Sequence, residues 1–204
     1  MKHLMAIFTL LFMTSLASFS SNAYSIENSP YTVIAETGER LFSRIAKDQE
    51  SLKKFPELMR DIVEEELMPS IDYKYAAFKV LGRNLRTMTP EQREKFVVSM
   101  RSYLVRTYAI ALKQYKQQDV AFESHKSTNG ARIVGVNSVI RNANAPEINI
   151  TFQMRQDRQT SQWKAYDMII EGISLLSSKE AEISQRIQKS GIDQVTLELA
   201  SFNQ

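Results

Sequence analysis

The side chains that could do chemistry in this sequence are few. The chain has no cysteine and two histidines, of which His125 alone lies beyond the N-terminal segment. A nucleophilic triad and a zinc site both need partners that this composition does not supply around a single imidazole. The glycines form neither a phosphate-binding loop nor a dinucleotide fingerprint. We therefore expect no catalytic residue, no metal, no cofactor and no enzymatic activity.

Asp167 and Glu171 are one pair of acids that could act together. Four residues apart on a strand, they could face the same way and mimic the carboxylate pair of a glycosidase. Acids beside an apolar strand are also typical of hydrogen-bonded strand ends. A carboxylate-based hydrolase stays open as an alternative, which an Asp167→Asn variant that loses turnover would support.

These acids lie in or beside a stretch, Trp163 to Ile170, that reads as a half-buried strand. Its residues alternate, which is the period-2 signature of a β-strand. One face is expected to carry Lys164, Tyr166, Met168 and Ile170, and the other Ala165, Asp167 and Ile169. The strand is strongly apolar on its first face, so the rest of the chain must supply something to pack against it.

Residues 1–23 have the features of a secretory signal peptide. Lys2 precedes an apolar run, and small residues follow up to a cleavage site after Ala23. The run is shorter than the roughly 20 residues that a membrane span needs. We expect residues 24–204 to form a single exported domain. The formal net charge of the whole chain is +3, so the charge balance indicates no nucleic-acid partner.

The remaining sequence divides into a helical part, a sheet and a second helical part. Apolar residues recur at spacings of three and four within 30–116 and again within 178–202. Within 119–172 the period changes to two, and short turn segments separate four strands, at 120–124, 133–140, 148–154 and 163–170. The pattern predicts an α+β fold in which a twisted four-stranded antiparallel sheet packs against several helices.

The longest expected helix begins at a capping box, Thr89-Pro90-Glu91-Gln92, and carries an apolar, aromatic face up to Tyr115. This face and the sheet can either close into a solid core or stay apart around a guest molecule. Periodicity alone does not decide between them. A periplasmic adaptor with a filled core and no ligand is therefore a second alternative.

Several segments together resemble one known family. They are Met68 to Gly82, Thr89 to Glu94, Tyr103 to Tyr108, Trp163 to Ser174 and Lys189 to Asp193. In this order they resemble the MlaC family, also called toluene-tolerance proteins. The resemblance runs over nearly all of the chain after residue 23, and it is weakest between Val120 and Asp157.

The resemblance implies a periplasmic phospholipid-binding shuttle with an apolar lipid pocket between the sheet and the helices. It also implies two partners, an outer-membrane lipoprotein–porin complex and an inner-membrane ABC-transporter complex with an MCE-domain subunit. Such a shuttle carries phospholipids between these complexes and maintains the lipid asymmetry of the outer membrane.

We expect the pocket to be lined by the inward-facing members of each period. These are Tyr75, Phe78, Leu81, Phe96, Met100, Tyr103, Leu104 and Tyr108 from helices, and Phe122, Ile148, Ile150, Phe152, Tyr166, Met168 and Ile170 from strands. The lipid phosphate is expected outside this apolar lining, in water or near Lys164. Arg83 and Arg86 are candidate docking residues for acidic partner subunits.

Overall fold

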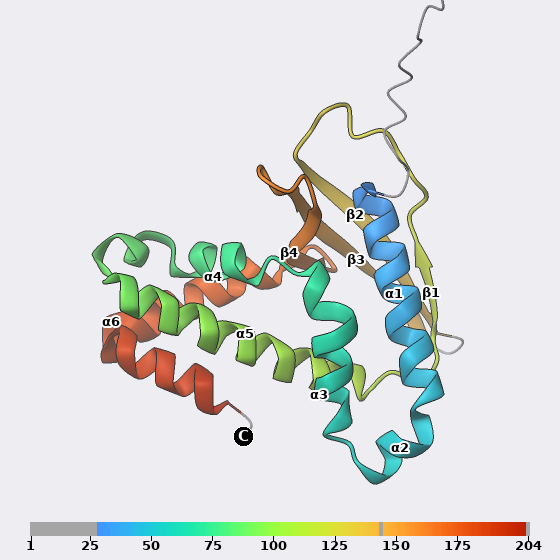
Figure 1. Ribbon diagram of the computed structural model, residues 1–204, viewed down its shortest axis with the longest axis horizontal. Coiled ribbons are helices and arrows are strands. Elements are labelled where there is room, and N and C mark those ends of the chain that lie inside the picture. The colour runs from blue at the N-terminus through green and yellow to red at the C-terminus, as the bar shows by residue number, and fades with distance from the viewer. Residues whose placement is uncertain (1–27, 143–144, 203–204) are drawn as a thin grey trace, which may run out of the picture.

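The computed structural model describes residues 28–142 and 145–202, so the expected signal peptide, 1–23, lies outside the described residues. Figure 1 shows two groups of elements. A sheet crossed by α1 (Pro30–Lys47) forms one group, and α4 (Tyr73–Leu81), α5 (Pro90–Leu112) and α6 (Leu175–Ser201) form the other. Below them, α2 (Gln49–Lys54) leads into α3 (Leu58–Ile62), which contacts both α1 and α5.

The sheet is an antiparallel meander in the order β1-β2-β3-β4-β5. Its strands are β1 (Asp119–Phe122), β2 (Ile133–Asn142), β3 (Ala145–Gln156), β4 (Trp163–Ile170) and β5 (Ile173–Ser174). The antiparallel sheet confirms the expected fold class, but it has five strands rather than four. The fifth is a two-residue strand that pairs with the end of β4, where Gly172 at φ 80° allows the tight reversal.

A β-bulge changes the expected alternation along β4. Phe152 pairs with Met168 and Gln153 with Asp167, but the next pair is Met154 with Ala165. The bulge therefore places one more residue on β4 than on β3 between these pairs. The expectation that Ala165 shares one face with Asp167 and Ile169 is wrong, because the bulge turns Ala165 toward Met154 in the core.

Side-chain caps fix where the main helices begin. The Ser29 hydroxyl accepts a hydrogen bond from Thr32 N at 3.1 Å at the start of α1. At the start of α5 the capping box is complete, because Gln92 N donates to the Thr89 hydroxyl and Thr89 N donates to the Gln92 side chain. Such caps satisfy backbone donors that a helix leaves unpaired at its first turn.

Two helical segments differ from the expected pattern. Within the helical part expected over 30–116, α3 changes into a π-helical turn, Val63–Leu67, which is followed by a 3-10 turn, Met68–Ser70. The helical part expected over 178–202 is one element, α6, with a kink at Gly191. Gly191 has φ 79° and ψ 164°, a conformation open essentially to glycine, and it turns the second half of α6 back beside the first.

The core consists of three clusters. One joins α1 to the sheet around Val136 and Met154, and another joins α1, α3 and α5 around Ile62 and Val63. A third joins α4, α5 and α6 around Phe96, which is fully buried. Between the sheet and α4, α5 and α6, side chains of both layers line a hollow.

A polar seam joins the two layers beside this hollow. Asp72 N donates to the Ala165 carbonyl at 2.7 Å, and the Asp72 carboxylate accepts from Tyr75 N at 3.0 Å at the start of α4. The Arg155 guanidinium forms an ion pair with Asp72 and lies 4.4 Å from the ring centre of Tyr75. Asp72 therefore ties both β3 and β4 to α4.

Among residues 28–142 and 145–202, no helix is both long enough and apolar enough to cross a membrane.

Candidate functional site

The hollow between the layers is a cavity of about 350 Å³. This volume lies at the lower end of the roughly 300–1,000 Å³ that small-molecule pockets occupy. Its walls come from α4, α5, the end of the π-helical turn, β3, β4 and the first turns of α6. The lining residues are Leu67, Ile71, Ala76, Val80, Met100, Tyr103, Leu104, Thr107, Tyr108, Phe152, Ala165, Tyr166, Asp167, Met168, Leu175, Leu176, Ser178, Lys179 and Glu182.

This lining is apolar except at one end. Leucine, isoleucine, methionine, aromatic and alanine side chains supply most of the wall. The charged and serine members are Asp167, in β4 and hydrogen-bonded to the start of α6, and Ser178, Lys179 and Glu182, in the first turns of α6. The cavity is therefore suited to an amphipathic guest with an extended apolar part and a polar end near α6.

A smaller cavity of about 100 Å³ lies on the other side of the same wall, between α1 and the sheet. It is lined mainly by apolar residues of α1, β1, β2 and β3. Both cavities share the side chains of Leu67, Ile71, Phe152 and Ala165. These four residues therefore form the partition between the two spaces.

Two other hollows lie on helix surfaces and have volumes of about 390 and 400 Å³. The first, between α2 and α5, is bordered by Lys53, Lys113 and Lys116, and the second, between α5 and α6, is bordered by Glu91, Glu94 and Lys95. These lysine and glutamate borders differ from the enclosed apolar wall of the cavity beside β4. That cavity is the better candidate for an apolar guest.

The structure brings together part of the residue set that we expected from the sequence. Seven of the expected residues line the larger cavity: Met100, Tyr103, Leu104, Tyr108, Phe152, Tyr166 and Met168. Phe122 and Ile150 instead line the smaller cavity, which Phe152 also reaches. That any of these residues contacts a lipid stays a prediction.

The other expected residues lie elsewhere. Leu81 and Phe96 are fully buried in the cluster between α4, α5 and α6, and Phe78 packs against that cluster. Tyr75 packs edge to face on Tyr166, with 5.1 Å between the ring centres, and forms part of the polar seam. Ile148 is 40% exposed near the start of β3, and Ile170, which pairs with Ile150 and Ile173, lines neither cavity. Periodicity identified most of the inward-facing helix residues, but an inward face can meet another side chain as well as a cavity, and Ile148 is exposed.

Sequence reasoning missed several lining residues. Leu67 and Ile71 come from irregular turns that carry no clear period, and Ala165 is turned inward by the bulge. Leu175, Leu176 and Lys179 belong to the first turns of α6, which begins three residues before the expected helical part, 178–202. Ser174, whose hydroxyl accepts from Ser177 N at 2.9 Å, was the signal that could have placed this helix start.

Lys164, expected near the lipid phosphate, does not line either cavity. Within the described residues that line the larger cavity, Lys179 is the only lysine or arginine.

Tyr108 lines the larger cavity from α5, and its phenol stays neutral. It is half-buried by surface area, and it faces the cavity. Burial, the Asp167 charge and Tyr103 raise the pKa of Tyr108 to about 12. A phenol with this pKa stays neutral across the physiological range, so Tyr108 itself adds no charge to the cavity wall.

Asp167 and Glu171 are both engaged in hydrogen bonds. Asp167 accepts from the Ser174 hydroxyl at 2.7 Å, from Leu176 N at 2.9 Å and from Met168 N at 2.7 Å. Glu171 accepts from Asn149 N at 2.5 Å at the opposite side of β4. These bonds hold the β4–β5–α6 connection together, which is the strand-end role that the sequence left open.

His125 lies away from both cavities, and its Nδ1 is 3.1 Å from the Ser29 hydroxyl at the start of α1. Among the residues that the structure describes, no group of three or more histidine, cysteine, aspartate or glutamate side chains could hold a metal ion.

Comparison with known proteins identifies a family. The model of the MlaC protein family matches residues 35–201. An intermembrane phospholipid transport system binding protein, MlaC, of Haemophilus influenzae is 32% identical over 188 residues, which cover 91% of this chain and 87% of that protein. The toluene tolerance protein ttg2D of Pseudomonas putida is 23% identical over 166 residues, covering 80% and 75% of the two chains.

A solved structure shares the fold. The phospholipid-binding protein from Ralstonia solanacearum, determined in complex with a phospholipid, superposes with a TM-score of 0.72 and 23% sequence identity. The match covers 85% of this chain and 99% of that protein. The α+β arrangement of helices around an antiparallel sheet is therefore that of a known protein.

Proposed function

This chain belongs to the MlaC family, and from that premise we propose that it is a periplasmic phospholipid-binding shuttle. The observation that carries the proposal is the apolar cavity of about 350 Å³ between the sheet and the helices. Support comes from the names of the relatives, since one is a phospholipid transport binding protein and another was determined with a phospholipid. The cargo is a phospholipid, and no cofactor takes part.

The energetics of transfer explain why such a carrier is needed. Each buried methylene contributes about 0.8 kcal/mol, so two chains of roughly 15 carbons represent on the order of 24 kcal/mol of apolar transfer. A lipid that leaves a membrane for water would lose nearly all of this favourable transfer free energy. A cavity that buries the same chains keeps the exchange close to neutral, and the direction of transport is then set by the partners.

The cavity also bears on the two alternatives. An adaptor with a filled core would leave no apolar hollow between the sheet and α5, yet the hollow lies there. A hydrolase would need a free carboxylate, whereas Asp167 already accepts three hydrogen bonds. Turnover of a lipid ester that disappears in an Asp167→Asn variant would nevertheless establish the hydrolase and overturn the carrier proposal.

Loading of a charged cavity variant tests the proposal. Met168 faces the larger cavity on β4, so Met168→Glu places a carboxylate where the acyl chains would lie. A charge buried without a partner costs several kcal/mol, which should abolish loading of a fluorescent phospholipid into lipid-free protein. Val98→Glu is the control, because Val98 is 60% exposed on α5. A folded Met168→Glu protein that still loads fully would refute the assigned site.

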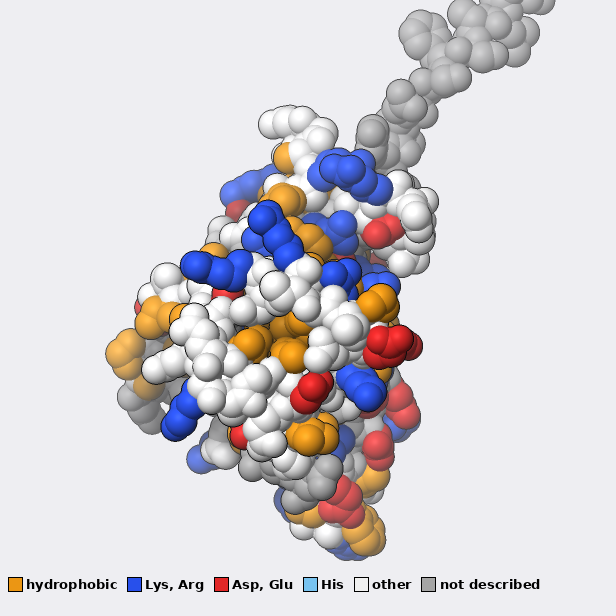
Figure 2. Space-filling view, turned by 90° about the vertical axis from the view of Figure 1, so that its left-hand side faces the viewer, with side chains coloured by type: hydrophobic (Ala, Val, Ile, Leu, Met, Phe, Trp, Pro, Cys, Tyr) orange, Lys and Arg blue, Asp and Glu red, His pale blue; other side chains and the backbone are white. Residues whose placement is uncertain are grey.

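Partner complexes complete the proposed function. We propose that this chain binds two partners, an outer-membrane lipoprotein–porin complex and an inner-membrane ABC-transporter complex with an MCE-domain subunit. The face shown in Figure 2 carries lysine and arginine side chains mainly in its upper half, around exposed apolar side chains. Arg83 and Arg86 are exposed on the 3-10 turn Gly82–Thr87, where acidic subunits could reach them.

Charge reversal tests the docking residues. The double variant Arg83→Glu and Arg86→Glu should weaken binding to the partner complexes at low salt while bound lipid stays in place. Lys113→Glu with Lys116→Glu is the matched control, since it makes the same charge change at the same spacing beyond the far end of α5. Equal binding by both double variants across a salt titration would remove Arg83 and Arg86 from the interface.

A further inference from the structure

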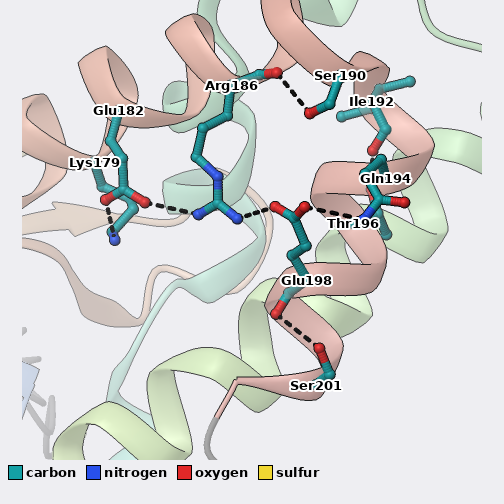
Figure 3. Close-up of polar contacts among 9 residues, drawn as sticks. All are labelled: Lys179, Glu182, Arg186, Ser190, Ile192, Gln194, Thr196, Glu198 and Ser201. Atoms are coloured by element: carbon teal, nitrogen blue, oxygen red, sulfur yellow. Dashed lines mark hydrogen bonds and ion pairs between the residues drawn. The ribbon is translucent and has the colours of Figure 1, made fainter.

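A row of charged side chains leads away from the polar end of the larger cavity along α6 (Figure 3). Lys179 Nζ donates to Glu182 Oε2 at 2.5 Å, and Arg186 Nη1 donates to Glu182 Oε1 at 2.9 Å. The other end of the Arg186 guanidinium pairs with Glu198, which lies beyond the Gly191 kink. The row therefore alternates in sign from Lys179 to Glu198, and Lys179 is its cavity end.

Lys179 is held in a defined position. Its side chain is 22% exposed, and its ammonium group lies 4.6 Å from the centre of the Tyr103 ring. Burial opposes the charge on Lys179, but the contacts with Glu182 and Tyr103 outweigh burial and raise its pKa. Lys179 is therefore a fixed cation between the apolar wall and the solvent.

We propose that Lys179 binds the phosphate of the lipid that occupies this cavity. The proposal rests on the function proposed above and adds a head-group site to it. Among the described lining residues of the cavity, Lys179 alone carries a positive charge, so a phosphate at the polar end has one cationic partner. A lysine ammonium has three donors and no acceptor, so it can bind a phosphate oxygen and still contact Glu182.

Glu182 keeps an ion-pair partner when Lys179 binds a phosphate. A carboxylate left unpaired in a partly buried site would be destabilising. Here the Glu182 oxygen that does not contact Lys179 already accepts from Arg186. The Arg186 guanidinium is in turn held by Glu198, whose other oxygen accepts from Gln194 Nε2 at 3.0 Å. The row thus keeps Glu182 compensated in the empty and in the occupied protein.

Other groups at this end of the cavity are less suited to an anion. The first backbone donors of α6 are already satisfied, since Leu176 N donates to Asp167 and Ser177 N donates to Ser174. Asp167 and Glu182 would repel a phosphate, and Lys164 lies outside both cavities. The head-group contact therefore belongs to Lys179 rather than to the helix terminus or to Lys164.

Paired ligands that differ only in the phosphate test the proposal. Lipid-free protein is titrated with phosphatidylglycerol and with diacylglycerol of the same chains, and inorganic phosphate is titrated alone. We expect wild-type protein to bind phosphatidylglycerol at least tenfold more tightly than diacylglycerol. Phosphatidylethanolamine should resemble phosphatidylglycerol, because both carry the phosphate.

Lys179→Met keeps the aliphatic stem and removes the charge. It should reduce the preference for phosphatidylglycerol to about twofold or less while diacylglycerol binding is unchanged, and Lys179→Arg should retain the preference. Lys164→Met and Lys189→Met are controls that should behave as wild type.

The possible results separate this inference from the proposed function. A wild-type protein that binds diacylglycerol and phosphatidylglycerol equally, or a Lys179→Met variant that keeps the preference, would overturn the head-group site while leaving lipid binding intact. Saturable binding of inorganic phosphate that is lost in Lys179→Met would reassign Lys179 to a free anion. Failure of wild-type protein to bind any of the lipids would overturn both proposals.

Discussion

Phe152 separates the two cavities, so its removal should change which lipids the protein holds. Its side chain lines both the space of about 350 Å³ and the space of about 100 Å³. Phe152→Ala deletes the ring and joins the two spaces into one larger cavity. We expect acyl chains that end at the Phe152 ring in the wild-type protein to extend into the space beneath α1 in the variant.

The magnitude follows from the methylenes that the joined cavity admits. Each additional buried methylene contributes about 0.8 kcal/mol, which is roughly a fourfold gain in affinity. Lengthening the chain by two carbons should therefore improve binding by roughly tenfold or more in Phe152→Ala, at chain lengths where wild-type protein no longer gains. Competition between phospholipids of different chain length, read by native mass spectrometry, measures this difference.

Phe96→Ala is the matched control. The chemical change is the same, but Phe96 is fully buried in the cluster between α4, α5 and α6. Deleting a buried phenyl ring costs about 3–5 kcal/mol, and we expect Phe96→Ala near the upper end and Phe152→Ala, which already borders two cavities, near the lower end. Urea unfolding of lipid-free protein measures both. Identical chain-length profiles for wild-type and Phe152→Ala protein would refute the assignment of Phe152 as the partition.

Three further predictions concern the frame around the cavity. Arg155→Met should lower the free energy of unfolding in urea by about 2–3 kcal/mol, because it leaves the largely buried Asp72 carboxylate without its ion pair. The control Arg158→Met, in an exposed turn, should change the free energy of unfolding by less than about 0.5 kcal/mol. Equal losses in the two variants would show that the polar seam does not depend on the Arg155–Asp72 pair. Gly191→Ala should cost about 1–3 kcal/mol in the same assay, since φ 79° is strained for alanine although nothing lies within 4 Å of the added methyl group, and an unchanged midpoint would mean that the α6 kink relaxes freely. Because burial raises the pKa of Tyr108 to about 12, the folded state retains this proton after the unfolded chain has lost it. The free energy of unfolding of the wild-type protein should therefore fall by about 2 kcal/mol relative to Tyr108→Phe between pH 10 and 12, and parallel pH profiles would contradict the raised pKa.

The sequence predicted the elements whose signals are local. The Thr89 capping box and the apolar period after it located α5, and β4 begins and ends where its alternation does. The bulge beside Ala165, the π-helical turn and the two-residue strand β5 were not predicted. The bulge is set by the register between β3 and β4, and β5 and the π-helical turn are too short to show a period of their own.

The candidate site was predictable only in part for a related reason. Periodicity shows which side chains of an element face inward, but whether they meet a neighbour or a cavity depends on the space between layers. Phe96 and Phe152 look alike in the sequence, yet one fills the core and the other borders two cavities. In the sequence, Lys179 looks like an ordinary exposed lysine on a helix. Only the position of α6 against β4 brings its side chain to the cavity.

The most direct test of the central claim is to identify what the purified protein carries. The protein is purified from its native cells without detergent, weighed by native mass spectrometry and extracted with organic solvent, and the extract is analysed for lipids. We predict a complex heavier than the chain by the mass of a phospholipid, with the same phospholipid in the extract. A protein with the mass of the chain alone and an extract without phospholipid would contradict the claim that the cavity holds lipid.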